Sequence, residues 1–134
     1  TLSLHDALPI YIKQRNPINH PCVMFKKSSV ELSGGYQPCP YFEDYDLWVR
    51  MYRDHAVFAN LPDTLLYMRV NGMHQRRGGI QYAKHIVEFR MKMYRYQVIT
   101  FGEFLPMTVA RVLVSLMPNG VRKYLYDKTL RKHK

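Results

Sequence analysis

Carboxylates are scarce in this chain of 134 residues, which carries 10 Asp and Glu against 20 Lys and Arg. A formal net charge of +10 predicts anionic partners: nucleic acid, acidic lipid or a phosphorylated small molecule. Cys22 and Cys39 are too few for a disulfide framework or a zinc knuckle, so we expect two reduced thiols. The sequence also lacks an uncharged apolar run of about 18 residues, so we expect no membrane-spanning helix.

The first ten residues, TLSLHDALPI, match one reading frame of a widely used sequencing-adapter oligonucleotide at every position. Residues that come from an adapter carry no folding information, so we exclude 1–10 from fold reasoning, as one would exclude a tag. The alternative is a native loop or a short helix. The match leads us to expect that the chain is the C-terminal part of a longer protein.

The rest of the chain has the composition of a packed domain, with 47% hydrophobic and 13% aromatic residues. Short apolar runs at 20–25, 56–62 and 64–70 predict β-strands. Helices are predicted from Glu43 to about Arg53, over 80–98, and over about 103–132 with an interruption at 117–120. This order is typical of the later half of an α/β domain, to which the terminal helices form an appendage.

Residues 26–36, KKSSVELSGGY, predict a short helix between the first strand and the acidic helix. Ser28 or Ser29 can cap its start, and Gly34-Gly35 can end it in a left-handed turn. On the long helix over 80–98, we expect one apolar face formed by Ile80, Ala83, Val87, Met91 and Tyr94.

Four of the ten acids fall between Glu43 and Asp54, and Glu43, Asp44 and Asp46 lie in the first turn of the predicted helix. The helix dipole favours acids there by about 0.3–1 kcal/mol each, which explains one or two of them without a functional role. However, the Pro-Cys-Pro loop before them is stiff and is expected to line a cleft. A carboxylate at a helix N-terminus on the edge of a cleft is well placed to accept a proton from a substrate hydroxyl.

The loop HQRRGG at 74–79 is a second candidate, because two arginines beside Gly-Gly can clamp phosphate oxygens with bidentate hydrogen bonds. A solvated basic loop is the alternative. His74 could ligate a metal or simply lie on the surface. Asn19 and His20, in the turn NPINHP, could face the same cleft as the acids or serve only the turn.

The C-terminal residues 101–134 carry seven Lys or Arg and two acids among regularly spaced apolar residues. A basic amphipathic segment of this type can lie on an anionic membrane surface. It can equally be a helix packed on its own domain.

Five segments together resemble the C-terminal half of a family 2 glycosyltransferase of the GT-A fold. The resemblance is to the bacterial subgroup that builds capsular, exopolysaccharide and lipopolysaccharide chains, the amylovoran-type enzymes. The segments occur in the family's order, and they are RNPINHPCVMFKKSSVELSGGY, FEDYDLWVRM, NLPDTLLYMRV, RRGGIQYAKH and LMPNGVRKYLYDKTLRK. Any one of them alone would be a weak match.

The resemblance implies an incomplete α/β domain: the C-terminal part of a Rossmann-like GT-A domain followed by C-terminal amphipathic helices. Residues 11–74 would form its acceptor side, and 75–134 the helical appendage. Enzymes of this type transfer a sugar from a nucleotide-sugar to an acceptor hydroxyl with inversion at the anomeric carbon. The parent protein would act in surface polysaccharide biosynthesis on a saccharide or lipid-linked saccharide acceptor, in the cytoplasm or at the inner face of the cytoplasmic membrane.

The resemblance also assigns roles to residues. Asp44 would be the general base, and Trp48 and Arg50 would fix its helix in place. Glu43 would hold or orient the acceptor, and Gly34, Gly35 and Tyr36 would lie against the donor sugar and the acceptor. From the turn NPINHP, His20 is a further candidate for substrate binding. The leaving diphosphate calls for a divalent cation, Mg²⁺ or Mn²⁺, and for arginines, for which Arg69, Arg76 and Arg77 are the candidates.

The family's nucleotide-binding half, with its metal-binding Asp-x-Asp, has no counterpart in this sequence. Asp44-Tyr45-Asp46 spells that pattern, but it lies inside FEDYDLWVRM, where the Glu-Asp pair followed by YDLW matches the family's Glu-Asp motif, and we interpret it as accidental. We therefore expect this chain to bind neither the metal nor the donor, and to have little or no transferase activity alone.

A basic nucleic-acid-binding module is the alternative from another class, because Tyr82, Tyr94 and Tyr96 lie among Arg and Lys. No recognised nucleic-acid motif occurs, and acids occupy the one stretch with features of a site. A membrane-surface module without catalysis is a third possibility. We favour the transferase and expect no nucleic-acid partner.

Overall fold

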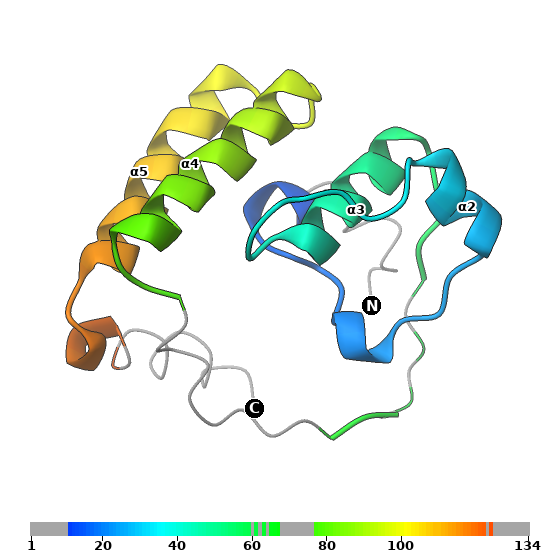
Figure 1. Cartoon of the computed structure of the whole chain (residues 1–134), viewed down its shortest axis with the longest axis horizontal. Helices are drawn as coiled ribbons and strands as arrows, with labels where there is room; N and C mark the ends of the chain where they lie inside the picture. The colour runs from blue at the N-terminus through cyan, green and yellow to red at the C-terminus, as the bar shows by residue number, and fades with distance from the viewer. Residues whose placement is uncertain are drawn as a thin grey trace.

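The computed structural model describes residues 11–59, 61, 63, 65–67, 77–122 and 124. Within them lie a short 3₁₀ helix, η1 (His20–Cys22), and the α-helices α2 (Lys27–Leu32), α3 (Glu43–Arg53), α4 (Ile80–Arg95) and α5 (Phe101–Leu116). In Figure 1, α4 and α5 run side by side, and α4 lies between α5 and the group formed by η1, α2 and α3. The predicted boundary between 74 and 75 falls outside the described residues.

The predicted α/β sheet is not seen, because the described residues form helices and no strand. Residues 20–25 were expected to be a strand, but His20–Cys22 form η1, with Pro21 in its first turn. Val23 does have an extended backbone, with φ −120° and ψ 141°. A strand also needs a neighbour to pair with its N–H and C=O groups, and the described residues provide none. In the second predicted strand, 56–62, residues 56–59 have no regular secondary structure. Most of the third, 64–70, lies outside the described residues.

Helix α3 has the bounds that the sequence predicted, Glu43–Arg53. It forms because Leu47, Trp48 and Met51 recur at helical spacing and all three are buried. The predicted cap of α2 by Ser28 or Ser29 is wrong, because Lys26 precedes the helix and no side chain caps it. The left-handed turn after α2 is confirmed, with φ +81° at Gly34 and +63° at Gly35.

The core forms where α3 packs against α4 through aromatic side chains. Phe42 stacks on Phe89 with ring centroids 4.8 Å apart, and Tyr45 contacts the same ring at 4.8 Å. The Tyr45 hydroxyl donates a hydrogen bond of 2.6 Å to the carbonyl of Ile12, whose side chain is fully buried. These contacts hold the start of α3 and the segment before it in one position.

The apolar face predicted for α4 is wrong in part. Ile80 is 82% exposed and Tyr94 41% exposed, whereas Ile86, Phe89 and Met93 are buried. Apolar residues surround most of this helix, so periodicity alone left the choice of the inner face open. Helix α5 begins with a capping box, in which Thr100 accepts from the Glu103 amide and Glu103 accepts from the Thr100 amide.

Candidate active site

The three acids at the start of α3 lie in three different environments. Glu43 is exposed, Asp44 is half-buried and Asp46 has no exposed surface. A dipole-driven cluster would leave all three in solvent at the helix end. The helix therefore presents one acid to solvent, holds one at the surface boundary and buries the third.

Asp44 is held in a fixed orientation by an asparagine from the preceding segment. Asn16 Nδ2 donates to Asp44 Oδ2 at 2.7 Å, and Asn16 Oδ1 accepts from the Ile18 amide at 3.2 Å. The other carboxylate oxygen accepts from the Tyr45 amide at 2.8 Å. Each oxygen keeps further lone-pair capacity, so the carboxylate can still accept a proton from a ligand. The sequence prediction missed Asn16, because within NPINHP it considered only Asn19 and His20 as possible site residues.

Tyr36 and His20 come together near Asp44. The Tyr36 hydroxyl lies 3.5 Å from His20 Nδ1, and the two rings meet edge to face with centroids 5.7 Å apart. His20 also lies against Trp48, at 6.1 Å between ring centroids. Partial burial, and then the negative charge of Asp44, raise the pKa of the Tyr36 hydroxyl. Tyr36, His20 and Asp44, three candidate site residues from the sequence, therefore lie in one neighbourhood.

The glycine turn beside this neighbourhood is held by Arg50, which is 2% exposed. Its Nη2 donates to the Gly35 carbonyl at 2.7 Å, and its Nη1 donates to the Ser33 carbonyl. Its Nε donates to Asp46 Oδ2 at 3.0 Å. The Asp46–Arg50 pair is therefore a buried clamp that fixes Gly34 and Gly35 against α3.

Asp46 also ties α3 to α4, because Lys92 Nζ lies 3.0 Å from its Oδ1. The Cys39 thiol lies in the same buried region. Burial, and then the negative charge of Asp46, raise its pKa to about 11. Asp46 is thus committed to two cations of its own chain, which gives it a structural role.

The phosphate-binding role of Arg69, Arg76 and Arg77 stays a prediction. Arg69, Arg76 and His74 lie outside the described residues. Arg77 is exposed ahead of α4, where its carbonyl accepts from Arg122 Nη1 at 3.3 Å. Among the described residues, no group of three His, Cys, Asp or Glu could hold a metal ion.

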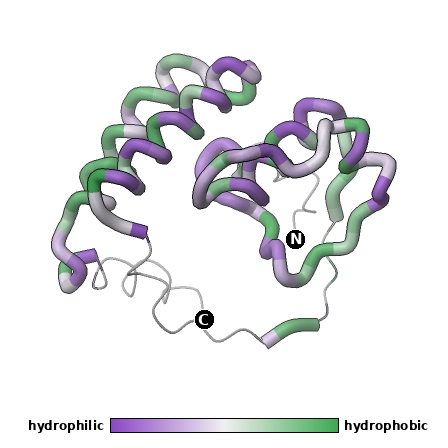
Figure 2. Tube along the Cα trace, viewed as in Figure 1, coloured by the Kyte–Doolittle hydropathy of each residue, from purple (hydrophilic) through white to green (hydrophobic). Residues whose placement is uncertain are grey.

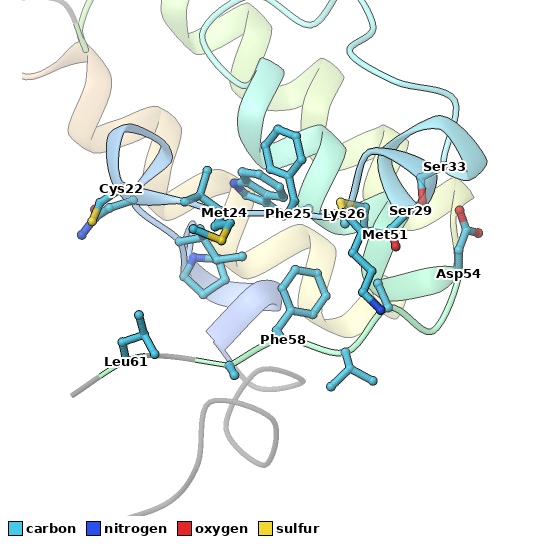
Figure 3. A pocket seen from close by; sticks show the side chains of 18 of the residues that line it. Cys22, Met24, Phe25, Lys26, Ser29, Ser33, Met51, Asp54, Phe58 and Leu61 are labelled. Atoms are coloured by element: carbon cyan, nitrogen blue, oxygen red, sulfur yellow. The ribbon is translucent and has the colours of Figure 1, made fainter. Parts of the chain in front are cut away.

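A groove of about 1030 Å³ lies beside α3 (Figure 3). Its walls include Met24, Phe25, Trp48 and Phe58, together with residues from η1 and α2. None of Asp44, Tyr36 or the glycine turn lines it. Residues from the stretches predicted as strands, 20–25 and 56–62, form much of its wall. Trp48, against which His20 lies, belongs to the wall as well, so the groove adjoins the candidate site.

Three curated bacterial proteins match almost the whole chain. It is 35% identical over 123 residues to the Escherichia coli UDP-Gal:alpha-D-GlcNAc-diphosphoundecaprenol beta-1,3-galactosyltransferase, and 37% identical over 120 residues to the amylovoran biosynthesis glycosyltransferase AmsE of Erwinia amylovora. An uncharacterized glycosyltransferase of Haemophilus influenzae is 38% identical over 125 residues. The matches cover 91%, 88% and 91% of this chain. No family model and no solved structure matches.

These matches place the chain among the glycosyltransferases. It belongs with bacterial glycosyltransferases, and it spans 45% of the length of each of these three relatives. The expectation of a glycosyltransferase is thereby confirmed, and the 45% coverage fits the expected incomplete domain. Membership of family 2 and the GT-A fold stay predictions. A basic nucleic-acid-binding module is not favoured.

Proposed function

We propose that the enzyme to which this chain corresponds transfers a sugar from a nucleotide-sugar donor to a saccharide hydroxyl, with inversion, as a family 2 enzyme of the GT-A fold. This chain supplies the acceptor side and the general base, Asp44. The observation that supports this proposal is the Asn16-oriented carboxylate at the N-terminus of α3, next to Tyr36 and the clamped glycine turn.

The chemistry requires one base. The acceptor oxygen forms a bond to the anomeric carbon while the bond from that carbon to the nucleotide diphosphate breaks. The hydroxyl proton passes to Asp44. A single displacement of this kind needs one carboxylate opposite the leaving group, whereas a glycosidase needs two. The exposed Glu43, at the start of α3, is placed to orient the acceptor.

A divalent cation, Mg²⁺ or Mn²⁺, would neutralise the leaving diphosphate in such an enzyme. The described residues do not fit a site for it. Asp46, the second acid of Asp44-Tyr45-Asp46, is buried against Arg50 and Lys92 and has no surface for a metal. We therefore assign cation binding to parts of the enzyme outside the described residues. Arg69, Arg76 and the exposed Arg77 stay the candidates for the diphosphate.

The acceptor class comes from the E. coli relative, whose name specifies GlcNAc-diphosphoundecaprenol. We propose an acceptor of the same kind, a saccharide linked through a diphosphate to a polyprenyl lipid. Such an acceptor resides at a membrane surface, so the enzyme would work in peripheral contact with the cytoplasmic face of the cytoplasmic membrane. No helix in the described part of the chain is long and apolar enough to cross a membrane.

Acceptor binding without donor binding tests this proposal on the 134-residue chain itself. We expect a soluble GlcNAc-diphosphate alkyl ester to shift the amide NMR signals of Gly34, Gly35 and Tyr36, because these residues flank Asp44. UDP-galactose should shift none of them.

Two tyrosines of similar exposure provide matched variants, Tyr36 at 49% and Tyr94 at 41%. Tyr36→Ala should weaken acceptor binding about tenfold through loss of a ring contact, and Tyr94→Ala should leave it unchanged. Acceptor-induced shifts confined to the groove residues Val57 and Ala59 would refute this placement of the acceptor.

A further inference from the structure

Among the residues that the structure describes, three other than glycine have a positive φ, and helix ends account for two of them. His55 (φ 61°) and Gln97 (φ 59°) come directly after the C-caps of α3 and α4. At both places the backbone amides donate back to the helix in the pattern of a Schellman motif, which needs a left-handed residue there. The third, Tyr41 (φ 69°), stands before a helix and closes none. Its backbone conformation therefore needs another explanation.

Tyr41 occupies the third position of a tight turn directly ahead of α3. The Phe42 amide donates to the Cys39 carbonyl at 2.8 Å, and Pro40 is the second residue of the turn. Because proline fixes a negative φ, the positive φ at the next residue defines a type II turn. Glycine or asparagine normally takes this position, since a bulky L side chain is strained there. The chain thus holds a large aromatic side chain where the backbone favours glycine.

The Tyr41 ring is half exposed, at 51%, yet it is held in one orientation. The Tyr82 ring lies 5.2 Å away between centroids, at an interplanar angle of 87°, and the His85 ring lies 5.5 Å away. His85 Nδ1 is in turn 2.9 Å from Glu88 Oε2. Packing against α4 therefore fixes the ring and leaves about half of it open to solvent. An aromatic ring that is already ordered can bind a ligand without a further ordering cost.

The turn brings this ring close to the acids of the candidate site. Tyr41 precedes Asp44 by three positions, so their Cα atoms are at most about 11 Å apart. Tyr36, whose hydroxyl is within the electrostatic influence of Asp44, lies at the other end of the same loop. Figure 2 shows the segment from α2 into α3 as mostly pale or hydrophilic, which is typical of a segment at the protein surface. An exposed aromatic ring therefore stands at each end of the loop that leads to Glu43 and Asp44.

We propose that Tyr41 is a further acceptor-binding residue, whose ring stacks on the C–H face of a pyranose ring while a hydroxyl of that sugar meets Asp44. A pyranose carries its hydroxyls around the rim and apolar C–H groups on its faces, so a fixed and exposed aromatic ring is complementary to it. The strained backbone supports this role, because strain of this kind clusters at binding and catalytic sites. The inference rests on the function proposed above, since it adds one residue to the acceptor side.

Nuclear Overhauser contacts on the unaltered 134-residue chain test the inference. The probe is the soluble GlcNAc-diphosphate alkyl ester. We expect contacts between the ring protons of Tyr41 and the C–H protons of the sugar, together with the amide shifts at Gly34, Gly35 and Tyr36. Those amide shifts without any contact to Tyr41 would overturn this inference and leave the proposed function standing. An ester that shifts none of the three amides would overturn both.

A pair of glycine variants gives a second measurement. Tyr41→Gly removes the ring at a position that glycine favours, and we expect the Kd of the ester to rise about tenfold. Tyr41→Phe keeps the ring and should bind the ester as the parent does. Gln97→Gly is the matched control, because it also places glycine at an exposed left-handed position, but at the end of α4, and it should leave the Kd unchanged.

Two results with these variants would contradict the role of Tyr41. The first is an equal Kd for Tyr41→Gly and the parent. The second is a Tyr41→Gly chain that circular dichroism shows to be unfolded, because the ring would then serve only the packing against α4.

Discussion

Replacing Asp44 by asparagine is expected to lower the rate of sugar transfer by about 10²–10⁴-fold, the usual contribution of a positioned general base. Asparagine keeps the shape of the side chain, and after an amide flip its oxygen can still accept the hydrogen bond from Asn16. It cannot take a proton from the acceptor hydroxyl. Binding of the acceptor should change little, so the loss should fall on kcat.

The measurement needs a protein that also binds the donor. A chimaera in which residues 11–134 replace the matching 45% of the E. coli galactosyltransferase provides one. Its transfer of galactose from UDP-galactose is compared with that of its Asp44→Asn variant. Asp54→Asn, at the other end of α3, is the matched control and should retain activity. Equal kcat values for the chimaera and its Asp44→Asn variant would refute the role of Asp44 as the base.

The contact between Asn16 and Asp44 predicts a smaller effect in the same chimaera. Asn16→Ala removes the 2.7 Å hydrogen bond that orients the carboxylate, but it leaves the base in place. We expect kcat to fall about tenfold, in proportion to one lost hydrogen bond to a charged group, with KM for the acceptor nearly unchanged. The result separates a positioning residue from one that binds the acceptor.

Replacing Asp46 by asparagine is expected to lower the free energy of unfolding by about 3–5 kcal/mol. The substitution leaves Arg50 buried without its carboxylate and removes the anionic partner of Lys92. The guanidinium then bears a desolvation cost that no counter-charge offsets. Its hold on Ser33 and Gly35 should weaken as well, because all three contacts depend on one side-chain position.

Urea unfolding of the 134-residue chain measures this loss. Glu31→Gln is the matched control, since it breaks an ion pair with Lys27 in which both side chains are largely exposed. Such pairs contribute at most about 1 kcal/mol, so this variant should unfold almost as the parent does. A loss of less than 1 kcal/mol for Asp46→Asn would contradict the buried clamp.

The helices could be predicted from the sequence, whereas the strands could not. Helix α3 depends on local spacing and on its own hydrogen bonds, so its bounds follow from Leu47, Trp48 and Met51. A strand depends on a partner strand. The run at 20–25 has strand-like composition, and Val23 has strand-like dihedral angles, but nothing in the described residues pairs with them.

The acids of the candidate site could be predicted from the sequence, but the residues that hold them in place could not. The cluster around Asp44 stands out against the basic composition, and the Glu-Asp motif carries the family resemblance. The partner Asn16 lies 28 positions earlier in the chain, and only the packing of the segment at residues 11–18 brings it to α3. Similarly, Arg50 was expected to fix its helix, but its hold on the Gly35 carbonyl follows from the course of the turn.

Helix α5 shows a different limit of sequence reasoning. Periodicity identified an amphipathic segment, but it cannot say which side of a helix meets the protein. Here the inward side carries Glu103 and Arg111 together with Phe104 and Val112, which pack against the core.

The most direct test of the central claim, that this chain carries the base and the acceptor side while the donor is bound elsewhere, is a galactose-transfer assay on two proteins in parallel. One is the 134-residue chain alone and the other is the chimaera with the E. coli relative. We expect product from the chimaera, lost with Asp44→Asn, and none from the chain alone. Product formed by the chain alone, and abolished by Asp44→Asn, would contradict the claim, as would a folded chimaera that transfers no sugar.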